Sequence, residues 1–132
     1  MSDKRETISD KREAGHDEPA DVDIEELFYQ GSDLHGEGKH AEAMACFDRC
    51  LAVDPDYVDA MYGKAMVHLA RSQFDDAIAC AMRIIELTPD DVLAHTNLSV
   101  FYQRAGRIAE AEEAAAKAKV LDWKRQIGGG GS

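Results

Sequence analysis

The chain has 132 residues, of which 45% are hydrophobic and 31% are charged, and its net charge is −11 at pH 7. This length suits one ordinary domain with a modest core, and the composition predicts that most of the chain folds. A surface with 26 acidic and 15 basic residues repels phosphate groups, which argues against binding to nucleic acid or to an anionic membrane.

The N-terminal residues are charged and contain no helical stripe of large apolar side chains, so we predict a flexible tail over residues 1–23. The sequence SDKRE occurs in it twice, at Ser2–Glu6 and Ser9–Glu13, either by chance or as a docking element. We find no signal peptide and no apolar segment of roughly 20 residues that could span a membrane. Because three cysteines, an odd number, suit a reducing compartment, we expect a cytoplasmic protein.

Strong helix formers dominate the rest of the chain, apolar-polar alternation is absent, and helix breakers cluster in short segments such as HGEGKH and TPDD. The pattern predicts six helices, at residues 24–36, 40–53, 58–70, 74–87, 92–104 and 108–126. Short connections place neighbouring helices antiparallel, so we expect three helical hairpins. The final GGGGS, residues 128–132, is typical of a Gly/Ser linker added for expression.

A period of 34 residues runs through the helical part, since Pro55 and Pro89 are 34 positions apart. Each proline lacks an amide hydrogen and ends a helix, and the aspartate after it, Asp56 or Asp90, is expected to cap the next helix. Small residues recur with the same period where the two helices of a hairpin must approach closely. They are Gly31, Ala65 and Ser99 in the first helices and Ala43, Ala77 and Ala111 in the second helices.

This arrangement resembles the tetratricopeptide repeat, whose signature is matched in three successive blocks. The matching residues are Gly31, Ala43, Phe47 and Pro55, then Ala65, Ala77 and Pro89, then Tyr102, Gly106 and Ala111. The resemblance implies one all-α domain over residues 24–127, with repeats 24–57, 58–91 and 92–125 stacked as a right-handed superhelix, an α-solenoid of three antiparallel hairpins. It also implies a non-catalytic adaptor or scaffold that binds other proteins in a concave groove.

Residues with catalytic or metal-binding chemistry form no recognisable constellation in the sequence. Cys46 and Cys50 share a helical face, and Cys80 recurs at the Cys46 position, but there is no Cys-x-x-Cys pair. His35 and His40 flank a Gly-rich turn, and two imidazoles alone are a weak indication of a metal site. We therefore expect no enzyme, no metal and no cofactor.

In proteins of this family the first helix of each hairpin lines the groove, and the resemblance implies which side chains do so here. The predicted set comprises Glu25, Phe28, Asp59, Tyr62, Met66, Leu69, Leu93, Asn97, Val100 and Arg104. This strip is mostly apolar with acidic residues at one edge, which favours a protein or peptide partner with apolar and basic side chains, as an amphipathic helix or extended segment. The alternative is that these side chains only pack within the protein itself.

The best-known groove of the family clamps the acidic C-terminal tail of heat-shock chaperones with Lys, Asn and Arg. The corresponding positions here carry no cation, so we expect no binding of such tails. These positions are Phe28, Ser32, Gly63, Leu93 and Asn97.

The last predicted helix carries a second candidate surface, because no fourth hairpin follows to cover it. Its apolar residues at helical spacing are Ala116, Val120, Trp123 and Ile127. An exposed face of this kind predicts, as an alternative function, self-association into a homo-oligomer. The same face would also be left by the loss of a capping helix.

Overall fold

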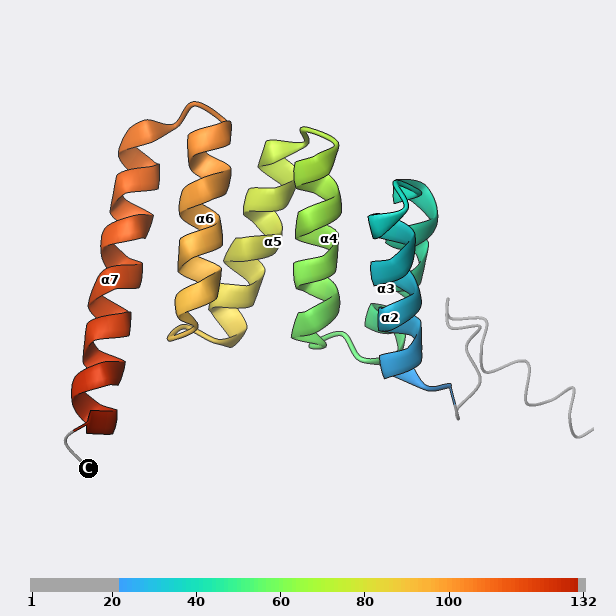
Figure 1. The fold of residues 1–132 in the computed structure, drawn as a ribbon, viewed down its shortest axis with the longest axis horizontal. Helices are drawn as coiled ribbons and strands as arrows, with labels where there is room; N and C mark the ends of the chain where they lie inside the picture. Colours follow the sequence, from blue (N-terminus) through green and yellow to red (C-terminus); the bar gives the residue numbers. More distant parts are fainter. Residues whose placement is uncertain (1–21, 131–132) are drawn as a thin grey trace, which may run out of the picture. The chain divides into compact units, whose positions relative to one another are not determined.

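The computed structural model describes residues 22–130, and within them the chain forms six α-helices and no strand (Figure 1). The helices are α2 (Ile24–Gly36), α3 (His40–Val53), α4 (Val58–Ala70), α5 (Phe74–Leu87), α6 (Val92–Arg104) and α7 (Ile108–Gly130). The first five have the predicted bounds, whereas α7 continues four residues beyond the predicted end, because no proline follows Trp123 to stop it. In the described residues, no helix combines the length and the apolar character needed to cross a bilayer.

The helices belong to two compact units, with the division inside α4. Unit 1 ends at Ala60 and contains α2, α3 and the first residues of α4. Unit 2 begins at Met61 and contains the rest of α4 together with α5, α6 and α7. Within unit 1, α2 packs against α3, and within unit 2, α6 packs against both α5 and α7 (Figure 1). Of the predicted tail, residues 1–23, the first 21 lie outside the described part. Its last residue, Asp23, is instead the N-cap of α2, where its side chain accepts hydrogen bonds from the amides of Glu25 and Glu26.

The core of unit 1 depends on the smallest side chain of α2. Leu27, Gly31 and Phe47 are buried, and Phe47 is only 1% exposed. A Cβ atom placed on Gly31 would lie 2.7 Å from Cε1 of Phe47, closer than real Cβ contacts come. Glycine is therefore required here so that α2 and α3 can approach with the Phe47 ring between them, as the repeat alignment predicted.

The core of unit 2 joins all four of its helices. Its buried members are Ala65, Ala77, Ile78, Ala81, Leu98, Phe101, Tyr102, Ala111 and Ala114. At the position aligned with Gly31, Ser99 is buried, and its hydroxyl donates a hydrogen bond of 2.8 Å to the carbonyl oxygen of Ala111. A small polar side chain is tolerated there because its one donor is satisfied by the facing helix.

The helix caps differ from the sequence prediction by one residue at α6. The side chain of Asp91, not that of Asp90, accepts hydrogen bonds from the amides of Leu93 and Ala94 at 3.0 and 3.4 Å. In the matching turn before α4, Asp54 accepts from the amide of Asp56 at 3.0 Å. The predicted cap at Asp90 was therefore wrong, because α6 begins at Val92 and the cap position is the residue directly before it, Asp91.

The connections within the hairpins repeat one backbone conformation. Gly38 and Gly106 both have φ of 81°, and Ser72, at the aligned position of the middle hairpin, has φ of 59°. Left-handed backbone of this kind suits glycine and strains other residues. The turn geometry is thus conserved between repeats even where the residue is not glycine.

Candidate functional site

Seven of the predicted groove residues lie in unit 2, on α4 and α6. Leu93 and Val100 of α6 are exposed large aliphatic side chains, with 55% and 38% of their surface accessible. Met66 and Leu69 of α4 are half-buried and pack against the core of unit 2. We call these four side chains together the α4/α6 face, which combines exposed apolar groups on one helix with anchored ones on the other.

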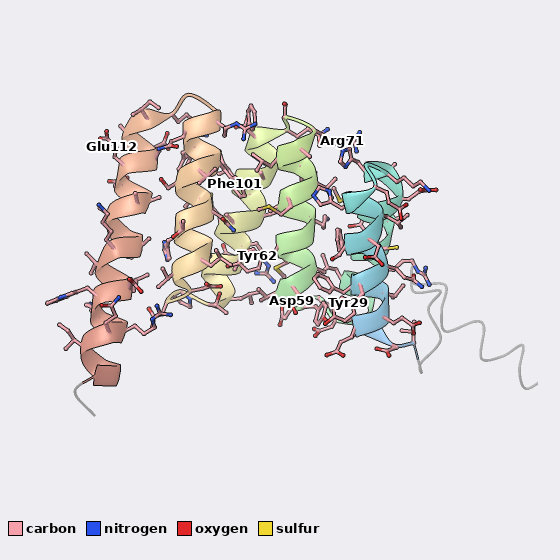
Figure 2. All side chains as sticks on the ribbon, in the orientation of Figure 1. Tyr29, Asp59, Tyr62, Arg71, Phe101 and Glu112 are labelled. Carbon is pink, nitrogen blue, oxygen red and sulfur yellow. The ribbon has the colours of Figure 1, made fainter. Side chains whose placement is uncertain are left out.

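Tyr62 has a structural role that the sequence pattern did not indicate. Its hydroxyl donates a hydrogen bond of 2.7 Å to Oδ2 of Asp91, the carboxylate that also caps α6. Figure 2 labels Tyr62. This bond joins α4 to the start of α6 across 29 positions of sequence. A tyrosine predicted to contact a partner therefore holds two helices of unit 2 in register.

Two polar members of the predicted set, Asn97 and Arg104, lie on α6. Asn97 is half-buried, and Arg104 is exposed in the last turn. The guanidinium carbon of Arg104 lies 5.5 Å from the centroid of the Phe74 ring, within cation–π range. Its positive charge is also favourable at the C-terminal end of a helix dipole.

The other three predicted groove residues, Glu25, Phe28 and Asp59, lie in unit 1. Phe28 is half-buried, and its ring centroid lies 5.4 Å from Tyr29, 5.9 Å from Phe47 and 6.3 Å from Tyr57. Glu25 and Asp59 are exposed. The structure thus places Phe28 in an aromatic cluster, of which the prediction had identified one ring.

The apolar residues of the last helix are exposed, as predicted. Trp123, Val120 and Ile127 have 62%, 49% and 52% of their surface accessible. Ala116 is exposed too, and together with Val120 it lines a pocket of about 440 Å³ whose other walls include Pro89 and Leu121. The pocket lining also includes the charged residues Asp90, Glu113, Lys117 and Lys124. The exposed tryptophan and aliphatic side chains of α7 form a surface that another molecule could cover.

The groups that could do chemistry are dispersed or packed. In the part of the chain that the structure describes, no group of three or more His, Cys, Asp or Glu could hold a metal ion. The three cysteines are thiols, and burial raises the pKa of Cys46, which keeps it in its neutral form. His95 is buried with Nε2 2.9 Å from the carbonyl oxygen of Pro89, and the rings of His35 and His40 lie 5.5 Å apart.

Three residues that matter to these surfaces were not among the predicted site residues: Tyr29, Tyr57 and Asp91. Tyr57 could have been suspected from its place in DPDY, because the turn brings it back toward α2. Asp91 gave no separate signal, because it stands beside an equally plausible cap, Asp90.

The chain is similar to known proteins in its repeat region. Two family models, both described as tetratricopeptide repeat, match residues 34–96 and 80–113. A rat protein named DnaJ homolog subfamily C member 3 is 33% identical over 92 residues, which are 70% of this chain and 18% of that protein. The chain therefore spans less than a fifth of this relative's length.

Solved structures with the same fold include two that cover most of the chain. The crystal structure of MamA has a TM-score of 0.73 at 24% identity, over 77% of this chain and 60% of that one. The second TPR of Spaghetti, bound to the HSP90 peptide SRMEEVD, has a TM-score of 0.68 at 20% identity, over 74% of this chain and 91% of that one. Both support an all-α helical-repeat fold.

Proposed function

The chain belongs to the tetratricopeptide-repeat family, and from this premise we propose that it is a non-catalytic adaptor that binds a protein segment on the α4/α6 face. Proteins of this family are protein–protein interaction modules. The observation that carries the proposal is the exposure of Leu93 and Val100 on α6, together with the half-buried Met66 and Leu69 that pack on the core of unit 2 from α4. Exposed aliphatic side chains beside anchored ones are typical of surfaces that receive apolar residues of a partner.

The partner is proposed to be a helix or extended segment with apolar and basic side chains. The net charge of −11 supports a basic partner and opposes nucleic acid and anionic membranes. A cytoplasmic location is part of the proposal, supported by three cysteines that remain thiols.

We do not propose an acidic chaperone tail as the partner, because its negative charge would have no positive counterpart at the positions that clamp such tails in the family. The Spaghetti structure holds the peptide SRMEEVD, which ends in three acids and one valine. The positions predicted to correspond to the family's tail clamp carry no cation in this chain. They are Phe28, Ser32, Gly63, Leu93 and Asn97. An acidic tail would therefore meet no compensating charge at those positions.

The test uses peptides selected from a displayed random library against the full chain. Replacing Leu93 and Val100 with Glu should weaken binding of the selected apolar peptides at least tenfold, because two charges would oppose the apolar contact. Both side chains are exposed, so helicity by circular dichroism should not change. Met82→Glu is the matched control, since Met82 is an exposed apolar residue on α5, outside the α4/α6 face. Equal binding by the double variant and the parent chain would exclude this face.

Self-association through α7 is the second candidate, favoured by the exposure of Trp123, Val120 and Ile127. A second copy would bury these side chains in an interface related by symmetry. Under this proposal Trp123→Glu converts a larger species to monomer in multi-angle light scattering. A parent chain that is already monomeric at about 1 mM would rule the interface out.

A further inference from the structure

Unit 1 carries a second surface, distinct from the α4/α6 face, on which aromatic rings lie beside carboxylates. Phe28 is at the centre, with the rings of Tyr29 and Tyr57 at 5.4 and 6.3 Å. Phe47 is buried behind Phe28 and fixes it from the core side at 5.9 Å. Tyr29 is 61% exposed, so the cluster presents an open aromatic ring to solvent.

Two carboxylates accompany these rings. Glu25 precedes Phe28 and Tyr29 by three and four positions on α2, so that all three share one side of the helix. Asp59 lies in the first turn of α4, two residues after Tyr57. Burial raises the pKa of the Tyr57 hydroxyl, and the negative charges of Asp59 and Glu25 raise it further, which places both carboxylates within electrostatic range of that ring. Figure 2 labels Tyr29 and Asp59.

The charge around the cluster is strongly one-sided. Residues 22–60 contain ten Asp and Glu against two Lys and Arg. The charged side chains that perturb Tyr57 are acids only. An approaching cation would therefore meet an attractive field and the negative faces of the rings together.

We propose that Phe28, Tyr29 and Tyr57, with Glu25 and Asp59, form a binding site for an arginine side chain of the partner. This rests on the proposed function, that the chain binds a protein segment. Arginine fits better than lysine, because its planar guanidinium stacks on an aromatic face and still donates hydrogen bonds in plane to carboxylates. The site therefore favours partners that carry an accessible arginine.

The test titrates the full chain with N-acetyl-L-arginine amide and follows backbone amides by NMR. The matched probe is the citrulline analogue, which has the same shape but a neutral urea in place of the guanidinium. We expect the arginine probe to change the amide chemical shifts of α2 and of residues 57–59. The dissociation constant should be in the millimolar range, as expected for a single side chain. The citrulline probe should bind at least fivefold more weakly.

Variants separate the two components of the site. The pair Glu25→Gln and Asp59→Asn removes two charges without changing side-chain shape. It should lower the affinity for the arginine probe at least fivefold. Tyr29→Leu should weaken it as well, whereas Tyr29→Phe should not, because the ring and not the hydroxyl makes the contact. The control pair Glu112→Gln and Glu113→Gln changes net charge equally on exposed residues of α7 and should leave the affinity unchanged.

Three results would overturn the assignment. Equal chemical-shift changes with both probes would show that the cation is not recognised. If the α7 control pair weakens binding of the arginine probe as much as the pair at Glu25 and Asp59, the effect is due to net charge and not to the site. A variant with Lys4, Arg5, Lys11 and Arg12 replaced by Ala should, without any probe, show the same amide chemical shifts for α2 as the parent chain. If these chemical shifts change, the chain's own N-terminal segment occupies the site instead of a partner. None of these results depends on the α4/α6 face, so the proposed function is tested separately by Leu93 and Val100.

Discussion

At the scale of single residues, the size of one side chain decides whether a hairpin can close. The 2.7 Å separation between a Cβ at Gly31 and Cε1 of Phe47 leaves no room for alanine, and Phe47 is buried and cannot turn away. We expect Gly31→Ala to lower the free energy of unfolding by about 1–3 kcal/mol, measured by urea denaturation.

Two further variants make this prediction specific. Gly36→Ala is the control, because nothing lies within 4 Å of a Cβ there, and it should leave stability unchanged or raise it by up to about 1 kcal/mol. Phe47→Leu should relieve part of the penalty when combined with Gly31→Ala. If Gly31→Ala and Gly36→Ala behave alike, the close approach of α2 and α3 is not what requires glycine.

Ser72 is a residue at which the repeat is not optimised. It has φ of 59° where the aligned Gly38 and Gly106 have φ of 81°, and it is exposed. Ser72→Gly should raise the free energy of unfolding by roughly 0.5–1 kcal/mol, because glycine adopts this backbone without strain. The reverse change, Gly106→Ser, should lower it by a similar amount. Thermal melting followed by circular dichroism measures both, and a loss of stability in Ser72→Gly would contradict the strain.

At the scale of helices, the start of α6 is fixed by one carboxylate that serves two purposes. Asp91 caps the helix and accepts the hydroxyl of Tyr62 from α4. Asp91→Ala should therefore cost about 2 kcal/mol, since a cap and a charged hydrogen bond are lost together. Asp90→Ala, one residue earlier, should change stability by less than about 0.5 kcal/mol. Urea denaturation measures the loss of stability in each variant. Equal losses would contradict the assignment of the cap to Asp91 rather than Asp90.

At the scale of the whole molecule, the two units differ in how many helices contribute buried apolar residues. The buried hydrophobic residues of unit 2 come from four helices, whereas those of unit 1 come from α2, α3 and the beginning of α4. Repeat proteins unfold locally when neighbouring parts differ in stability. Hydrogen exchange should therefore show lower protection in α2 and α3 than in α5 and α6. Uniform protection across all of these helices would mean that the chain unfolds as one cooperative body.

Much of the fold could be predicted because its signals are local. The bounds of five helices follow from breakers and periodicity, and the 34-residue alignment alone identifies Gly31, Ala65 and Ser99 as sites of close packing. The end of α7 was placed too early, because the sequence there offers no proline to mark a stop. The residues of the α4/α6 face were named from the family resemblance, and their binding role remains a prediction.

The sequence by itself determined the helical hairpins, their repeat length and the acidic charge, because these depend on backbone propensities, turn residues and composition. Only the tertiary structure decided that Asp91 rather than Asp90 caps α6 and that Tyr62 is bonded to it. It also decided that Tyr29 and Tyr57 join Phe28 beside two carboxylates. The Tyr62–Asp91 and Phe28–Tyr57 contacts join residues from different helices and turns, and such separations carry no periodic signal. Their geometry exists only after the helices have packed.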